Sequence, residues 1–447
     1  MLLRTNIHTP YTLSTTNHTG KVYDVSNWND HPGGSVIFSH AGDDMTDVFA
    51  AFHPPSAWNV ISKYEIGDLD ESVIPSGLYA NKLVPQKQKN FEKAYRDLRL
   101  QLVQMGLFNA SYGYYAWKVS SNLLLLALSI YCAVSTTSTL VNFVGACILG
   151  LFWQQSGWLA HDFLHHQVFK TRWMGDLMGV FIGNVLQGFS VQWWKCKHNT
   201  HHAVPNLHAS SQTAADGDPD IDTMPILAWS LRMAEQATES KFGRFMIKWQ
   251  AVFYFPALLF ARLAWAHQSW VYVFGGAGQH SVKGAENDRK IMAFPRLESA
   301  ALVLHYAWLG AVMYHMTPLN AFMYFMVAQT SCGLFLATVF GLGHNGMAVY
   351  PADQRPDFWK LQVSTTRNVT GNFLSDWFCG GLQYQVDHHL FPQLPRHNLP
   401  KVHALVESFC KEQGVTYHEA NMWDGTVEVL QHLSSVSAEF IKEFPAM

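Results

Sequence analysis

Histidine is the residue type in this chain whose number and spacing point most directly to chemistry. There are 23 histidines among 447 residues. Many of them fall in three short clusters, HDFLHH at 161–166, HNTHH at 198–202 and QVDHH at 385–389. Residues three and four positions apart on a helix share one face, so each cluster can direct several side chains toward one point. Imidazole nitrogen is a suitable ligand for iron, copper, zinc and nickel.

The clusters together hold more imidazoles than one ion can bind, so the sequence predicts two metal ions. One HxxHH cluster alone would more often be a surface or core pair, but three clusters beside apolar hairpins favour a metal centre. A structural zinc site usually includes cysteine, so histidine without cysteine fits iron used for oxygen chemistry better. His165 and His166 are alternatives for one position. The candidate ligands in the clusters are His161, His165, His166, His198, His201, His202, Gln385, His388 and His389.

Two further positions belong to the same prediction. His344 lies in GLGHN, just beyond a long apolar stretch and level with the clusters. A lone histidine is ordinarily structural, but this placement makes His344 an additional candidate ligand. Gln385 opens the third cluster, and an amide oxygen is a poorer ligand than imidazole. Gln385 is therefore expected either to bind weakly or to support another ligand.

A different histidine pair lies near the start of the chain. KVYDVSNWNDHPGG at 21–34 contains His31, and DVFAAFHPPSAW at 47–58 contains His53. Two neutral imidazoles on opposite sides of a haem, with glycine where the backbone approaches the ring, would form a six-coordinate site for electron transfer. HPGG alone could equally be a turn beside an unrelated histidine. The flanking KVYDVS and FAAFH patterns favour the haem site.

Long uncharged stretches must position these clusters. No Asp, Glu, Lys or Arg occurs in 119–160 or in 299–352. A membrane span needs about 20 residues, so each stretch is long enough for two spans. The polar residues at 135–139 predict one turn, and Pro318 interrupts the second stretch. A buried pair of soluble helices is the less favoured alternative because of the length without charge. The expected spans are about 119–136, 139–160, 299–316 and 319–343.

Two hairpins return the chain to the same side of a membrane. The N-terminal segment has no apolar core of the signal-peptide kind, so we expect it in the cytosol. That topology places 161–298 and 353–447 in the cytosol, together with every histidine cluster. A shorter apolar run, 249–261, is expected to be an interfacial or re-entrant helix with Lys248 and Arg262 at the lipid headgroups.

Composition agrees with a membrane protein. Only 14% of residues are charged, against about 25% in ordinary soluble domains. The net charge of −3 provides no basic field for nucleic acid. The six cysteines are scattered without a CxxC pair and are expected to be packing residues in a reducing compartment. The acidic segment at 217–223, GDPDIDT, suggests no mechanistic role and is expected to be a solvated cap or turn.

The N-terminal pattern resembles the cytochrome b5 family. This resemblance implies an α+β haem domain at 1–70, with its core at 21–70 and with His31 and His53 as the axial ligands of haem b. The twenty residues before Lys21 lack the first strand and helix pattern of that family, so we expect the front of the domain to be shortened or irregular. A linker is expected at 71–95.

The remainder, 96–447, resembles the membrane front-end desaturases, which are acyl desaturases fused to cytochrome b5. The resemblance rests on the order of the three clusters relative to the two hairpins and on glutamine at the start of the third. It is carried by long segments that look most like the Δ6 fatty acid desaturases of diatom and oomycete type. Among them are QQSGWLAHDFLHHQVF, GFSVQWWKCKHNTHHAVPNLH, VFGLGHNGM and WFCGGLQYQVDHHLFPQLPRH.

The resemblance implies an all-α polytopic domain in the endoplasmic reticulum membrane, with the haem domain and histidine clusters facing the cytosol. It implies two iron ions, O2 as co-substrate, NADH-cytochrome b5 reductase as electron donor, and an acyl-lipid or acyl-CoA substrate. The implied reaction introduces a cis double bond at Δ6 of C18 polyunsaturated chains, converting linoleate to γ-linolenate and α-linolenate to stearidonate.

Several alternatives remain open at the level of sequence. One is desaturation at Δ5 or Δ4, or at Δ8 of a sphingolipid, and another is an acyl hydroxylase fused to cytochrome b5. A non-catalytic haem or metal carrier is a third, which two metal equivalents and substrate-dependent oxygen uptake would exclude. Candidate residues for an acyl tunnel, with simple packing as the alternative for each, are Trp153, Trp158, Phe335 and Phe340. Candidates for contact with the substrate headgroup are Trp193, Trp194 and Lys195.

Overall fold

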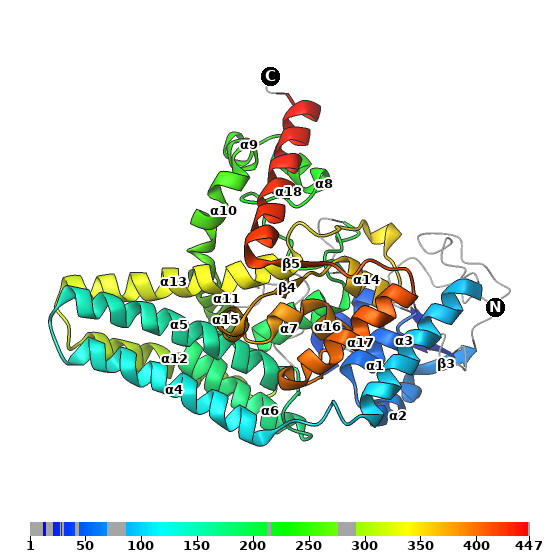
Figure 1. Ribbon diagram of the computed structural model, residues 1–447, viewed down its shortest axis with the longest axis horizontal. Helices are drawn as coiled ribbons and strands as arrows, with labels where there is room; N and C mark the ends of the chain where they lie inside the picture. Colours follow the sequence, from blue (N-terminus) through cyan, green and yellow to red (C-terminus); the bar gives the residue numbers. More distant parts are fainter. Residues whose placement is uncertain are drawn as a thin grey trace.

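The protein is described by a computed structural model. It describes residues 12–14, 21–26, 28, 31–40, 44–68, 86–211, 216–275 and 292–445. A small unit with a sheet lies at the N-terminal end, and a mostly helical body follows it (Figure 1). The expectation of an α+β unit followed by a helical domain is confirmed. The greater part of the expected linker, 71–95, lies outside the described residues.

The N-terminal unit contains an antiparallel sheet in the order β1-β2-β3. Its core includes Tyr23, Val25, Phe49 and Ile61, which are all buried. Strand β1 lies in the region where the sequence showed no recognisable strand, and it forms by pairing with β2. The elements are β1 (Thr12–Ser14), β2 (Lys21–Asp24), η1 (Gly34–His40), α1 (Thr46–Phe52), η2 (Pro55–Ala57), α2 (Trp58–Ile61), η3 (Ser62–Tyr64) and β3 (Glu65–Asp68).

Four long helices form an arm that projects to the left in Figure 1. They are α4 (Tyr112–Val134), α5 (Thr139–Leu164), α12 (Pro295–Met313) and α13 (Pro318–His344). Short turns join α4 to α5 and α12 to α13, where the sequence predicted hairpins. Pro318 begins α13 at a position where its missing N–H costs no helical hydrogen bond, and the Thr317 side chain caps the same end.

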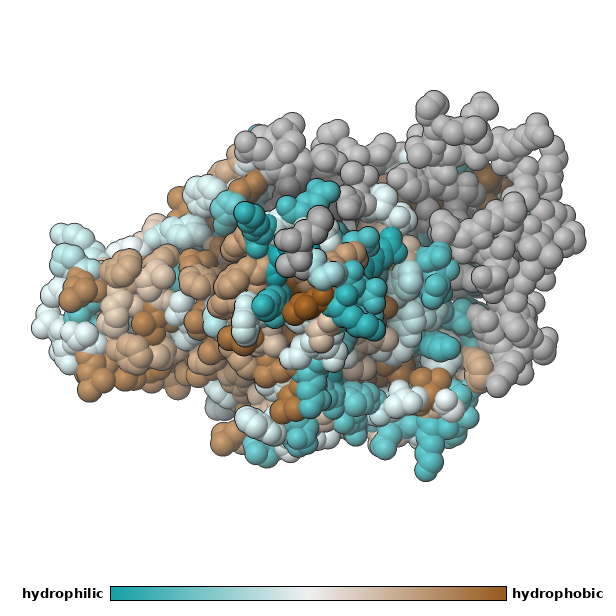
Figure 2. Space-filling view, turned by 90° about the horizontal axis from the view of Figure 1, so that it is seen from above, coloured by the Kyte–Doolittle hydropathy of each residue, from teal (hydrophilic) through white to brown (hydrophobic). Residues whose placement is uncertain are grey.

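Two helices of the described residues, α4 and α13, are long and apolar enough to cross a membrane. The other two long helices carry polar side chains that are buried against neighbours, such as Asn142 on α5 and His305 on α12. Large apolar side chains on the arm are exposed, including Leu124, Leu140 and Leu319. Hydrophobic surface covers much of the arm in Figure 2, as expected for helices that face lipid.

The remaining elements cover the base of the arm. They are α3 (Gln86–Gln104), α6 (Arg172–Gly179), the π-helical η5 (Val180–Gln187), α7 (Val191–Ala203), α8 (Leu231–Ala234), η6 (Glu235–Ala237), α9 (Lys241–Lys248), α10 (Gln250–Leu258), α11 (Ala261–Phe274), η8 (Ala352–Gln354), α14 (Phe358–Ser364), β4 (Asn368–Thr370), α15 (Phe373–Cys379), η9 (Leu382–Tyr384), α16 (Gln385–Leu390), η10 (Arg396–Asn398), α17 (Leu399–Glu412), β5 (Glu419–Asn421) and α18 (Met422–Glu443). Strands β4 and β5 pair in parallel.

The expectation that Arg262 lies at the lipid headgroups is wrong. The apolar run at 249–261 forms α10 and continues into α11, and Arg262 is only 2% exposed. Its guanidinium lies 3.9 Å from the centroid of the Trp153 ring and donates a hydrogen bond to Gln329 Oε1 at 2.6 Å. The aromatic face and the amide oxygen replace water around the cation, so burial is tolerated. Lys248, in contrast, is exposed.

Candidate metal centre

Four helices bring the three histidine clusters and His344 together at the base of the arm. The first cluster lies at the end of α5 and the second on α7. The third forms all of α16 except its last residue, and His344 is the last residue of α13. Contacts between histidines 143 and 186 positions apart show that the elements converge on one place, although the sequence separates them widely.

The first group of imidazoles could hold one ion. Its ligand atoms all lie within 4.8 Å of one another. Three Nε2–Nε2 distances are 3.0 Å for His165 and His198, 3.0 Å for His198 and His202, and 3.1 Å for His202 and His388. The members of the group, all buried, are His161, His165, His198, His202 and His388.

A second group lies beside the first. It consists of His201, His344 and His389, whose ligand atoms again lie within 4.8 Å of one another. The Nε2 atoms of His201 and His344 are 3.2 Å apart. The Gln385 amide lies 2.7 Å from His344 Nε2, so Gln385 is at the edge of this group. The described residues thus hold two neighbouring groups made of histidine alone, each of which could hold a metal ion.

The donor set fits bound metal. Two nitrogens held at right angles on one ion at about 2.1 Å would be about 3.0 Å apart, close to the distances between the rings. His161 Nε2 and His389 Nε2 are buried without a hydrogen-bond partner in the described residues. A buried polar atom without a partner is costly, and a metal ion would remove that cost.

Burial also keeps these imidazoles in the form that binds metal. Desolvation, together with the neighbouring histidines, lowers the pKa of His165 to about 3. The same causes lower the pKa of His198 and His389 well below the ordinary value of 6.5. Neutral imidazole is the form that donates its lone pair to a metal.

His165 and His166, the two alternatives in the first cluster, lie in different surroundings. His165 belongs to the first group, whereas His166 belongs to neither. The backbone of His166 is in the left-handed region, with φ of 57°, directly after the end of α5. That turn directs its side chain toward a second cavity near the N-terminal unit.

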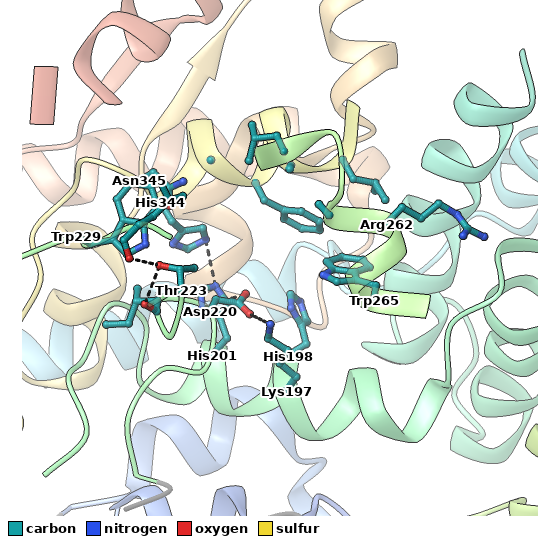
Figure 3. Close-up of a pocket in the computed structure, with 18 of the residues that line it drawn as sticks. Lys197, His198, His201, Asp220, Thr223, Trp229, Arg262, Trp265, His344 and Asn345 are labelled. Atoms are coloured by element: carbon teal, nitrogen blue, oxygen red, sulfur yellow. Dashed lines mark hydrogen bonds and ion pairs between the residues drawn. The ribbon is translucent and has the colours of Figure 1, made fainter. Parts of the chain in front are cut away.

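An apolar cavity of about 210 Å³ adjoins the imidazoles (Figure 3). His198, His201 and His344 form part of its wall, and Figure 3 shows Trp265 between them and Arg262. The other apolar walls come mainly from α7, α11 and α13 and include Trp193, Trp194, Leu336 and Phe340. The indole N–H groups of Trp193 and Trp229 have no partner in the described residues.

Some expected lining residues lie elsewhere. Trp153 stacks on Arg262 and Trp158 donates to the Phe378 carbonyl, so both act in packing around the cavity. Phe335 packs against Phe378. Lys195 forms an ion pair with Asp176 at 2.9 Å and lines the second cavity, nearer the N-terminal unit.

That second cavity, of about 480 Å³, contains His31 and His53. Their ring centroids are 6.0 Å apart. Two imidazoles bound on opposite sides of one iron at about 2 Å would have centroids about 6 Å apart. The Nδ1 atom of His31 lies 3.1 Å from the carbonyl of Gly34, and that of His53 lies 3.0 Å from the carbonyl of Phe49, so each ring is oriented by the backbone. The pair and the cavity therefore fit a bis-histidine haem.

Glycine is required beside this pair. A Cβ at Gly33 would lie 2.7 Å from Cε1 of the His31 ring. Gly34 has φ of 79°, a conformation that other residues rarely adopt. The HPGG motif thus provides the turn that places His31.

Comparison with known proteins decides the family. Residues 137–421 match the fatty acid desaturase family, and residues 16–70 match the cytochrome b5-like heme/steroid binding domain. The chain belongs to the fatty acid desaturase family. The desaturase is also similar over most of its length to curated proteins. These include an acyl-lipid (9-3)-desaturase of Physcomitrium patens, which is 40% identical over 93% of this chain and 74% of the relative.

Two further relatives match at nearly full length. The Delta(6)-fatty-acid desaturase of Caenorhabditis elegans is 33% identical, over 91% of this chain and 92% of the relative. A Delta(8)-fatty-acid desaturase of Euglena gracilis is 33% identical, over 95% of this chain and 96% of the relative. The expectation of a desaturase fused to a cytochrome b5-like domain is confirmed.

The desaturase surrounds its histidines with hydrogen-bond acceptors that sequence reasoning missed. His201 Nδ1 donates to Asp218 Oδ2 at 2.9 Å, and Gln362 Oε1 lies 2.9 Å from His389 Nδ1. These contacts turn Nε2 of each ring toward its group. Burial alone would lower the pKa of His201, but the charges of Asp218 and Asp220 raise it.

The expectation that 217–223 is a solvated turn is therefore wrong for Asp218, which is 4% exposed. Asp218 also accepts a hydrogen bond from the backbone N–H of Asn206 at 2.7 Å. The loop folds back against α7 because the Asp218 carboxylate accepts hydrogen bonds from both the His201 ring and the Asn206 backbone. Its signal in the sequence was a dense acidic segment shortly after the second histidine cluster, in a chain with few charges.

Proposed function

We propose that this desaturase is a front-end enzyme that introduces a cis double bond at Δ6 of C18 polyunsaturated acyl chains. The products would be γ-linolenate from linoleate and stearidonate from α-linolenate. The observation that carries the proposal is an apolar cavity whose wall includes imidazoles from both histidine groups. Such a cavity can hold a methylene chain against the metal centre and exclude water.

Iron ions are the proposed occupants of the two groups, one in each. The first group would use the five histidines of α5, α7 and α16, and the second would use His201, His344 and His389. Bound iron would supply the activation of O2 that removal of two hydrogens from unactivated methylenes requires. The chain itself orients the imidazoles through Asp218 and Gln362. We propose that Gln385 supports His344 and that His166 is not a ligand.

Electrons would come from NADH-cytochrome b5 reductase through haem b held by His31 and His53. We propose that the enzyme lies in the endoplasmic reticulum membrane with α4, α5, α12 and α13 as its spans and with domains at 1–70 and 96–447. The exposed apolar side chains of the arm support that arrangement. All histidine groups lie at the same end of the arm, which supports placing them on the cytosolic side.

The position of the new double bond is the most detailed part of the proposal. One relative is named for Δ6, another for Δ8, and a third for (9-3) desaturation. One methylene changes the free energy of apolar binding by only about 0.8 kcal/mol, so the length of the acyl tunnel alone selects poorly between neighbouring carbons. Anchoring of the substrate headgroup, which belongs to an acyl-lipid or acyl-CoA, must contribute to the choice of carbon.

Expression in yeast fed with linoleate or α-linolenate, followed by gas chromatography of the fatty acids, tests the proposal. We expect γ-linolenate and stearidonate, and neither product from a His388→Ala variant. Arachidonate from fed dihomo-γ-linolenate, without γ-linolenate from linoleate, would assign Δ5 instead. A hydroxylated acid as the main product would assign the enzyme as a hydroxylase.

A further inference from the structure

The cavity that contains His31 and His53 is not built by the N-terminal unit alone. Its wall also includes residues from the end of α5, from α6 and from α7. Among them are His165 of the first histidine group, its neighbour His166, and the cations Arg172 and Lys195. The same residue, His165, thus belongs to the metal centre and borders the haem cavity.

Helix α1 is the element that docks the N-terminal unit. Arg96 of α3 forms a two-point ion pair with Asp47, with Nε–Oδ1 of 2.7 Å and Nη2–Oδ2 of 3.1 Å. Arg99 donates to the carbonyl of Ala50 at 2.9 Å. Paired hydrogen bonds between guanidinium and carboxylate fix orientation as well as distance. These contacts therefore fix the orientation of the N-terminal unit on the helical body.

The end of α1 is held directly beside the metal centre. The carbonyl of Phe52 accepts hydrogen bonds from Arg172 Nη2, at 2.7 Å, and from Gln393 Nε2. Arg172 follows the first histidine cluster and Gln393 follows the third. Two segments that carry proposed iron ligands thus hold the residue that immediately precedes His53.

The side chain of Phe52 lies between the haem cavity and the first histidine group. Its ring lines the haem cavity and meets His202 of the first group edge-on, with centroids 6.2 Å apart. Phe52 is bonded through the backbone to His53. It therefore touches the proposed haem site on one side and a proposed iron ligand on the other.

We propose that Phe52 is the contact through which electrons pass from the haem to the iron held by His202. In each transfer the haem iron goes from ferrous to ferric and one iron of the histidine centre goes from ferric to ferrous. No bond forms or breaks, and the electron on the haem is replaced by a flavoprotein reductase that oxidises NADH. The inference rests on the proposed function for the presence of haem and iron, and not on the position of the double bond.

The test follows the haem instead of the fatty acid product. Full-length protein with haem and ferric iron is kept anaerobic, the haem is reduced by a flash-excited one-electron donor, and the loss of ferrous haem absorption is recorded. In wild type we expect fast loss of that absorption. In Phe52→Leu that loss should become slower, and in Phe52→Tyr most of the rate should return because the aromatic contact with His202 is kept.

Phe38→Leu is the matched control, because Phe38 is a partly buried phenylalanine of the same unit that does not line the cavity. Its rate should equal that of wild type. The haem spectrum and iron content, measured for every variant, show that both sites remain filled. Arg172→Gln, which removes one support of Phe52, should slow the transfer without changing the haem spectrum.

Two results would overturn the inference. One is a rate in Phe52→Leu that equals the wild-type rate while haem and iron are both bound. The other is equally fast loss of ferrous haem in protein from which iron has been removed, since the electron then goes elsewhere. A failure of the Δ6 proposal would be seen separately, in the fatty acids of the fed yeast.

Discussion

At the scale of single residues, two histidines that the sequence analysis proposed as candidate ligands, His344 and His166, have different surroundings. His344 lies in the second group with its Nε2 3.2 Å from that of His201, whereas His166 is directed away from both groups. We therefore expect His344→Ala to lose about one iron equivalent and nearly all desaturation, because an open ligand position weakens the site. Metal analysis and yeast feeding measure both effects.

His166→Ala provides the control for that substitution. It removes a half-buried imidazole of the same region but, on this assignment, no ligand, so iron content and product should remain near wild type. Loss of iron from His166→Ala together with full occupancy in His344→Ala would reverse the assignment.

Asp218 is a positioning residue of the centre, since its buried carboxylate accepts a hydrogen bond from His201 Nδ1 at 2.9 Å. Asp218→Asn removes the charge that orients His201, and we expect a 10–100-fold loss of iron affinity or activity, by order of magnitude. Asp222→Asn changes an exposed carboxylate of the same loop and should have little effect. Equal losses in the two variants would indicate that the loop as a whole, not the contact to His201, is responsible.

The buried imidazoles also predict how stability depends on pH. The pKa of His165 falls from 6.5 to about 3 in the folded state, mainly by desolvation. The unfolded chain therefore binds more protons than the folded one between these values, so stability rises with pH across that window. In metal-free protein we expect the unfolding temperature in detergent to fall as pH decreases below about 6.5.

Bound metal should make this dependence steeper, because protons compete with the ion for the same nitrogens. Thermal unfolding at several pH values, with and without chelator, measures the effect. A stability that stays constant from pH 7 to about pH 4 would contradict neutral buried histidines.

At the scale of elements, the metal centre depends on how α5 packs against α13. Gly150 of α5 allows close approach: a Cβ there would lie 3.0 Å from the backbone N of Cys332 and 3.1 Å from the backbone O of Ala328. Gly150→Leu should force the helices apart and destabilise the fold by about 1–3 kcal/mol. Because His161 lies in the last turn of α5, His165 directly follows that helix and His344 ends α13, iron should be lost as well.

Gly310 of α12 is the control, since a Cβ at that position meets nothing within 4 Å. Gly310→Leu should leave the iron content unchanged and should not lower the unfolding temperature, because leucine is a better helix former than glycine. If Gly150→Leu kept full iron and stability, the close contact between α5 and α13 would not be needed to align the histidines.

At the scale of the whole molecule, the N-terminal unit is held on the helical body by charge as well as by apolar contact. The Arg96–Asp47 pair is mostly buried, with side-chain exposures of 26% and 11%. Arg96→Asp should weaken docking by about 1.5–3 kcal/mol, because it removes charged hydrogen bonds and leaves Asp47 beside a like charge. Hydrogen exchange of α1 and α3, measured by mass spectrometry, should increase.

The exchanged pair tests whether the contact itself is responsible. Arg96→Asp combined with Asp47→Arg restores opposite charges, and exchange should return toward the wild-type level. An increase that persists in the double variant, or none in the single variant, would show that the apolar contacts dock the unit without this pair.

The sequence by itself determined the local chemistry and its approximate frame. Spacings of three and four placed the histidines of each cluster on one helix face, and HPGG with its flanking residues predicted the haem pair. Uncharged length and Pro318 located the hairpins to within a few residues of the observed helix ends. These features depend on neighbours along the chain, and local periodicity is visible without the fold.

Tertiary structure decided which helix faces pack against one another. It divided the histidines between two groups, placed His165 in the first group and His166 outside both, and brought Asp218 beside His201. It also buried Arg262 against Trp153 and set Phe52 against His202. Each of these outcomes joins residues that are distant along the chain or depends on the direction of one turn. Such contacts arise from the packing of whole helices, which the pattern within any single segment does not specify.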